Sequence, residues 1–174
     1  MTFSGKFVIT RQDNIYYNYF RIRRKLIGLA IMTFLILALM LALVRYAQGI
    51  SLLSALLQAF AVAVLGTILM VGFSLVSVIL RVNTRYRKGE MDDFTVHYIV
   101  DKNGVHVKSE RGDSEFSWKQ IQRAQETQHA IYLIAGESRA VVIPKGQIVN
   151  DGELNALRAL FRKYVTPGRI RMAR

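Results

Sequence analysis

The chain has 174 residues, enough for one ordinary domain and a smaller addition, and 52% of them are hydrophobic. It contains no cysteine, which excludes disulfide frameworks, cysteine metal sites and cysteine nucleophiles. The formal net charge of +12 suggests a nucleic-acid-binding protein, an interpretation that depends on where the charge lies along the chain.

The first apolar run covers residues 26–44 and contains no charged residue. As a helix it is long enough to cross about 30 Å of hydrocarbon. A cleaved signal peptide is the alternative, but its apolar region would be shorter and would not follow an aromatic-rich segment of this length. We therefore expect a transmembrane helix.

The second uncharged run covers residues 50–80 and is longer than a bilayer core requires. Polar residues cluster in its first third, at Ser51, Ser54 and Gln58. We expect the span at residues 59–80, with residues 50–58 forming either an interfacial turn or the emergent end of the helix. Pairs of small residues, Ala59 with Ala63 and Gly66 with Gly72, indicate either close helix contact or ordinary membrane-helix composition.

Only residues 45–49 separate the two runs, so residues 26–80 should form a transmembrane hairpin. Basic residues flank its outer ends, whereas the loop contains Arg45 alone. By the positive-inside rule both termini are cytoplasmic, and we expect the flanking residues to contact anionic lipid headgroups. These residues are Arg21, Arg23, Arg24, Lys25, Arg81, Arg85, Arg87 and Lys88.

The positive charge lies beside the membrane or in the C-terminal tail. Residues 91–164 have equal numbers of basic and acidic residues, and the excess falls in residues 1–25, at Arg45, in the linker 81–90 and in the tail 165–174. Nucleic-acid-binding domains carry basic stripes on the folded surface itself, so no nucleic-acid partner is predicted. We expect the tail to be flexible.

Residues 91–164 have the pattern of a small antiparallel β domain. Residues 94–100 alternate apolar and polar, and Asn103-Gly104 predicts a two-residue hairpin turn that would place Val100 opposite Val107 and Tyr98 opposite Ser109. About six strands follow one another, with turns at Arg111-Gly112-Asp113, near residues 128–129 and at residues 136–138. Trp118 is predicted to be a core anchor.

The three histidines do not predict a metal site. In the predicted register His97 lies opposite Glu110 and His106 opposite Asp101, which separates the two rings by about 13 Å. His129 falls in a turn, so all three are interpreted as surface residues. No phosphate loop or nucleophile elbow is present, and we expect no catalytic residue and no cofactor.

The segment AVVIPKGQI, residues 140–148, has two interpretations. Pro144 should end the last strand, because proline cannot donate to a ladder. Alternatively Lys145, with Arg139 as the nearest basic residue in sequence, forms a binding loop for an anionic partner. We prefer the strand end and keep Lys145 and Arg139 as the candidate interaction residues.

Both ends of the chain should belong to this domain. An amphipathic helix should begin at Asn150 or Asp151 and close the sheet. Residues 3–9 predict a strand that packs with the C-terminal sheet, and Thr10 should cap a helix running toward the membrane. Residues 1–25 are thus a cytoplasmic strand and amphipathic helix, and the fold class is membrane α+β.

The most specific features of this layout are Trp118 followed by Ile121, then Tyr132-Leu133-Ile134, and then Ile143-Pro144-Lys145. In these features and in its layout the chain resembles the YcxB-like family of bacterial membrane proteins. The resemblance implies a pleckstrin-homology-like (PH-like) C-terminal domain and a place in the bacterial inner membrane. It implies no catalytic or ligand residues.

These features are compatible with three functions. The preferred one is a non-enzymatic scaffold or regulator that presents its cytoplasmic domain to a protein partner. The alternative is an oligomeric accessory subunit of a transporter or channel, although neither span carries an ionisable residue for an ion pathway. An enzyme is the least favoured, because no catalytic motif is present.

Overall fold

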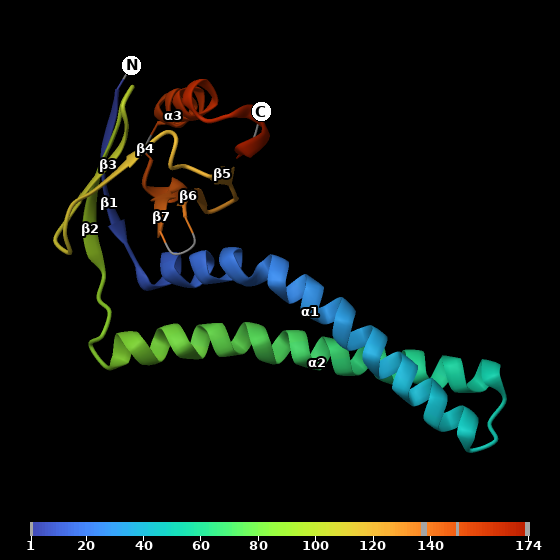
Figure 1. Ribbon diagram of the computed structural model, residues 1–174. Coiled ribbons are helices and arrows are strands. Elements are labelled where there is room, and N and C mark those ends of the chain that lie inside the picture. Colours follow the sequence, from blue (N-terminus) through green and yellow to red (C-terminus); the bar gives the residue numbers. More distant parts are fainter. Residues whose placement is uncertain (1, 137–138, 149, 173–174) are drawn as a thin grey trace. The chain divides into compact units, whose positions relative to one another are not determined.

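The computed structural model describes residues 2–136, 139–148 and 150–172 (Figure 1). The chain divides into two compact units, one formed by Met1–Tyr16 with Lys88–Arg174 and the other by Tyr17–Arg87. The first is a β domain with a C-terminal helix, and the second is a helical hairpin. Together they give the predicted α+β fold.

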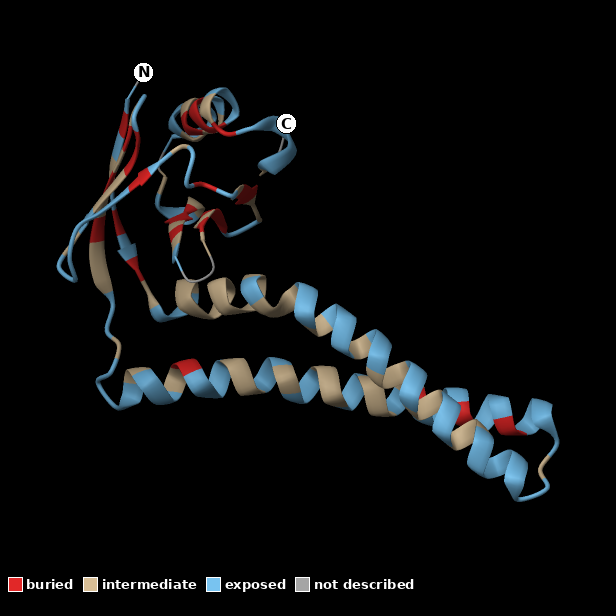
Figure 2. Cartoon of the chain, in the orientation of Figure 1, coloured by how far each residue is buried: buried red, intermediate tan, exposed pale blue. Residues whose placement is uncertain are grey.

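The hairpin consists of α1 (Arg11–Ala47) and α2 (Leu52–Arg87). Both helices are long and apolar enough to cross a membrane, and their large apolar side chains are exposed, up to 76% for Phe73 (Figure 2). Because α2 begins at Leu52, residues 52–58 belong to the helix, so of the two alternatives predicted for them the helix end is observed and the turn is not. Residues 81–87 likewise continue α2.

Small residues allow the two helices of the hairpin to approach each other. Ala55, Ala59 and Ala63 repeat every fourth position on α2 and are buried. A Cβ added at Gly66 would lie 3.0 Å from Leu37 Cδ1, whereas one added at Gly72 would meet nothing within 4 Å. The close contact predicted for the first of the two glycines is therefore present, and that for Gly72 is not.

The β domain contains two four-stranded sheets where the sequence predicted one. Sheet A has the order β1 (Phe3–Ile9), β2 (Phe94–Val100), β3 (Gly104–Ser109) and β4 (Ser114–Ser117). Sheet B has the order β7 (Arg139–Pro144), β6 (Ala130–Ala135), β5 (Arg123–Glu126) and β8 (Ile170–Arg171). The short 3₁₀ helix η1 (Lys145–Gln147) follows β7, so Pro144 ends the strand as predicted.

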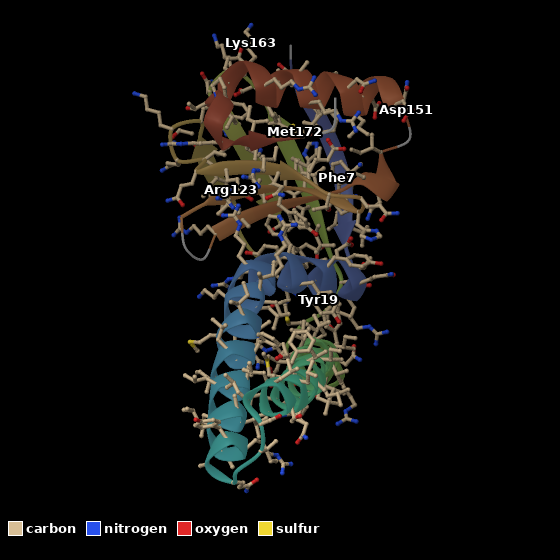
Figure 3. All side chains as sticks on the ribbon, turned by 90° about the vertical axis from the view of Figure 1, so that its right-hand side faces the viewer. Phe7, Tyr19, Arg123, Asp151, Lys163 and Met172 are labelled. Atoms are coloured by element: carbon tan, nitrogen blue, oxygen red, sulfur yellow. The ribbon has the colours of Figure 1, made fainter. Side chains whose placement is uncertain are left out.

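Strand β1 is an integral part of sheet A. It pairs antiparallel with β2 along its whole length, from Phe3 opposite Val100 to Ile9 opposite Phe94. Its inward side chains, including Phe7 at 3% exposure, belong to the domain core (Figure 3). The N-terminal strand thus packs with the C-terminal domain, as the sequence predicted.

The β2–β3 connection differs from the predicted turn. Val100 lies opposite Val105 and Tyr98 opposite Val107, two residues from the predicted register. The Asp101 carboxylate causes the shift, because its Oδ1 accepts from the N–H of Asn103 at 2.7 Å and of Gly104 at 3.1 Å. A shift of two residues keeps every side chain on its predicted face.

The structure leaves no room for a side chain at Gly104, so a substitution at this position tests the observed geometry of the connection. A Cβ at this position would lie 2.1 Å from the backbone oxygen of Phe116 in the adjacent β4. We expect Gly104→Ala to lower the free energy of unfolding by about 2–3 kcal/mol, because the strands would have to separate. Gly146→Ala is the control, since nothing lies within 4 Å of its added Cβ.

Urea titration followed by the fluorescence of Trp118, the only tryptophan, reports on this domain alone. Equal midpoints for Gly104→Ala and Gly146→Ala would contradict the observed close approach of β3 and β4.

Helix α3 (Asp151–Tyr164) covers the core. Asn150 caps it by accepting from the N–H of Gly152 at 2.8 Å, and its apolar face buries Leu157, Leu160 and Phe161. The Trp118 ring meets Phe161 edge-on, with the ring centroids 6.0 Å apart, so Trp118 is the predicted core anchor.

The C-terminal tail is ordered where the structure describes it. After the 3₁₀ helix η2 (Pro167–Arg169), β8 pairs in parallel with β5, placing Ile170 opposite Ala124 and Arg171 opposite Gln125. Val165 is buried, and Met172 packs against the core (Figure 3). The prediction of a flexible tail is wrong for residues 165–172, because their apolar side chains contribute to the core.

Candidate functional site

The predicted headgroup-contact residues gather at one end of the hairpin. Arg21, Arg23, Arg24 and Lys25 lie in the early turns of α1, and Arg81, Arg85 and Arg87 lie in the last turns of α2. Since the helices are antiparallel, both groups lie at the end opposite the 48–51 connection. Lys88 follows α2 directly. All but Arg23 are exposed, and Arg23 lies 4.7 Å from the centroid of the Phe20 ring.

Lys145 is held inside the domain by an ion cluster. Its Nζ lies 2.7 Å from Glu126 Oε1 and donates to the Thr127 carbonyl at 3.2 Å. Arg158 of α3 contacts both oxygens of the same carboxylate, with Nη2 at 2.6 Å from Oε1 and Nε at 3.0 Å from Oε2. The Glu126 side chain is only 3% exposed.

This cluster, formed by Glu126, Lys145 and Arg158, ties three elements together: β5, the start of η1 and α3. The hydrogen bonds to Glu126 raise the pKa of Arg158 above its ordinary value. A bidentate guanidinium contact to a buried carboxylate is among the strongest pairings in proteins. Lys145 is therefore engaged in an ion cluster within the domain, with its side chain 21% exposed.

Arg139 is exposed at the opposite end of β7 from Lys145. The six residues of the strand separate the two by about 20 Å, so they do not form one site. Arg139 instead borders an open pocket of about 440 Å³ together with Lys119 and Arg169. Gln120, Gln122 and Phe116 also line this pocket, which we call the basic pocket.

Sequence reasoning missed Lys119 and Arg169 because they are remote from Arg139 in the chain. Lys119 lies in the β4–β5 connection, and Arg169 reaches the basic pocket because β8 docks on β5. A two-residue parallel strand has no periodicity to detect, so no local signal indicated this docking.

A second open pocket, of about 360 Å³, lies at the start of α1. It includes Asp13, Tyr16, His129 and Gln147, and the Tyr16 and His129 rings stack with their centroids 3.9 Å apart. Asp13 and Gln147 are already bound, Asp13 to the Thr10 cap and Gln147 to both backbone groups of Val8. The Gln147 hydrogen bonds join β1 to η1, and the Tyr16–His129 stack joins the start of α1 to the β5–β6 turn.

The other histidines make surface contacts on sheet A. His97 lies opposite Lys108, rather than the predicted Glu110, and its Nε2 is 2.9 Å from Ser4 Oγ. His106 lies 3.1 Å from Glu115 and 3.6 Å from Asp101. Asn103 lowers the Asp101 pKa through its backbone N–H. Among the described residues, no group of three or more ligand-type side chains could hold a metal ion.

Comparison with known proteins gives one family match. Residues 100–161, from the end of β2 into α3, match the family model described as YcxB-like protein. No curated protein and no solved structure matches the chain. The matched segment contains Trp118, the β5–β7 meander and the Ile143-Pro144-Lys145 corner on which the resemblance was based. Residues 100–161 therefore form a YcxB-like domain.

Proposed function

We propose that the protein is a non-enzymatic integral membrane protein of the bacterial inner membrane, a scaffold or regulator that presents a cytoplasmic PH-like domain to a protein partner. The observation that carries this proposal is the position of the hairpin in the fold. It is inserted between β1 and β2, which are neighbours in sheet A and pair from Ile9 opposite Phe94 onward.

A domain built from both flanks of a membrane hairpin requires both flanks on the same side of the bilayer. This constraint is independent of charge, and it agrees with the topology predicted from the basic residues at the outer ends of the helices. With both flanks in the cytoplasm, the 48–51 connection crosses to the other side. The two exposed apolar helices supply the anchor.

The PH-like assignment is supported by the order of the elements. Two antiparallel layers, β1–β4 and β5–β7, are followed by a C-terminal helix whose apolar face covers the core. The non-enzymatic assignment is supported by two polar groups of the domain interior that are engaged in contacts within the fold. Glu126 binds Lys145 and Arg158, and Tyr98, whose pKa burial raises, donates to the Val142 carbonyl at 2.9 Å.

Photo-crosslinking in the native membrane tests the scaffold function. A photoreactive residue at Arg139, on the exposed rim of the basic pocket, should give a discrete adduct with a second protein. The same residue at the exposed Lys102 is the control and should not. Adducts only between copies of this chain would contradict the scaffold function and favour the oligomeric accessory subunit.

A further inference from the structure

The basic pocket gathers positive charge that is dispersed in the sequence. Lys119 comes from the β4–β5 connection, Arg139 from the start of β7 and Arg169 from η2. Among the described residues none of these three side chains has a carboxylate within ion-pair distance, in contrast to Lys145 and Arg158. Among the described residues that line the pocket one is acidic, Glu115, and its carboxylate lies 3.1 Å from the His106 ring.

We propose that the basic pocket binds a phosphomonoester dianion, presented either by a small soluble molecule or by a lipid headgroup. Cations held near one another without a counter-ion repel, and an anion with two charges relieves that repulsion. Guanidinium groups provide the donor geometry that phosphate oxygens require, and a lysine adds a point charge.

Neutral donors in the basic pocket support this assignment. Gln120 Oε1 accepts from the N–H of Ser117 at 2.9 Å, which leaves the amide NH₂ group of Gln120 without a partner in the described structure. Gln122 lies beside it and is exposed. Amide donors next to cations complete the hydrogen bonding of a phosphate, which offers three terminal oxygens.

The size and lining of the basic pocket favour a small ligand over an acidic peptide. Its volume of about 440 Å³ lies within the range of small-molecule sites, about 300–1,000 Å³. Apart from Phe116, its larger lining side chains are polar or charged. A peptide is held mainly by apolar anchors in desolvated pockets, and this lining provides few of them.

The docked tail is the feature that completes the basic pocket. Met172 and Ile170 fix residues 167–172 against the core, and Arg169 is thereby held beside the pocket. Arg171, two residues further on, is exposed in β8 and does not line the pocket. The two arginines provide a matched pair for a test.

The test uses the full chain in nanodiscs of zwitterionic phosphatidylcholine, titrated calorimetrically with glycerol 3-phosphate. We expect saturable binding, weakened about tenfold by either Arg139→Gln or Arg169→Gln, since each removes a charge-assisted hydrogen bond. Arg171→Gln and Lys102→Gln should change the affinity less than about twofold, as neither residue touches the basic pocket. Unchanged urea midpoints by Trp118 fluorescence establish that the variants are folded.

Two further experiments identify the source of the phosphate and test an acidic peptide as the alternative ligand. If lipid supplies the phosphate, nanodiscs containing phosphatidic acid should weaken glycerol 3-phosphate binding to the wild type; an unchanged affinity assigns the pocket to a soluble phosphate. Absence of binding at millimolar glycerol 3-phosphate, or an equal loss in Arg171→Gln and Arg169→Gln, would overturn the proposal. A glutamate-rich peptide that binds where glycerol 3-phosphate does not would also overturn it.

Discussion

Replacing Glu126 with glutamine should lower the free energy of unfolding of the β domain by about 3 kcal/mol or more. The substitution keeps the shape of the side chain but removes the negative charge that Lys145 and Arg158 share at 2.7 and 2.6 Å. Removing one partner from a buried ion pair costs about 3–5 kcal/mol, because the remaining charge stays desolvated without compensation. Here two cations would lose their common partner.

The measurement is a urea titration of the full chain in nanodiscs, followed by Trp118 fluorescence. Glu115→Gln is the matched control, because Glu115 also pairs with a basic side chain, His106, but is 79% exposed. Its effect should stay within about 0.5 kcal/mol, as for other surface pairs. Similar midpoints for the two variants would show that the buried cluster does not stabilise the fold.

Phe7→Ala should destabilise the same domain by about 3–5 kcal/mol. Phe7 precedes the hairpin in sequence, yet it is 3% exposed in the core and its ring centroid lies 5.6 Å from that of Tyr98. Truncating a buried phenylalanine removes its burial energy and leaves a cavity between the strands.

Val8→Ala is the control for this experiment. Val8 is adjacent in β1 but is 43% exposed on the opposite face, so its truncation should cost less than about 0.5 kcal/mol. Unfolding of both variants is followed by the fluorescence of Trp118, which is a residue in the part of the domain that comes after the hairpin in sequence. If Phe7→Ala and Val8→Ala had equal free energies of unfolding, β1 would not belong to the domain core.

The sequence predicted those elements whose signals are local. The two apolar runs form α1 and α2, and the segment with alternating apolar and polar residues forms β2. Pro144 is the last residue of β7, and Asn150 caps α3. The joining of β1 to the later strands was also predicted, because a transmembrane hairpin would place both of its flanks on one side of the membrane.

Features that depend on distant residues were not predicted. The Asp101 side chain displaced the hairpin register by binding backbone N–H groups that the turn signal ignores. Lys145 was interpreted without Glu126, which lies on another strand and becomes its partner only in the folded domain. Arg169 entered the basic pocket through a two-residue strand, and the separation into two sheets likewise follows from tertiary packing.

If both flanks of a membrane hairpin form one cytoplasmic domain, cysteine labelling in whole cells will find the two flanks on the same side of the membrane. The chain has no cysteine, so each introduced thiol gives the only signal. With a membrane-impermeant maleimide, Gln48→Cys in the interhelical loop should be labelled in intact cells. Ser4→Cys in β1 and Lys102→Cys after β2 should be labelled only once the membrane is permeabilised. Labelling of Ser4→Cys and Lys102→Cys from opposite sides of the membrane would contradict the account.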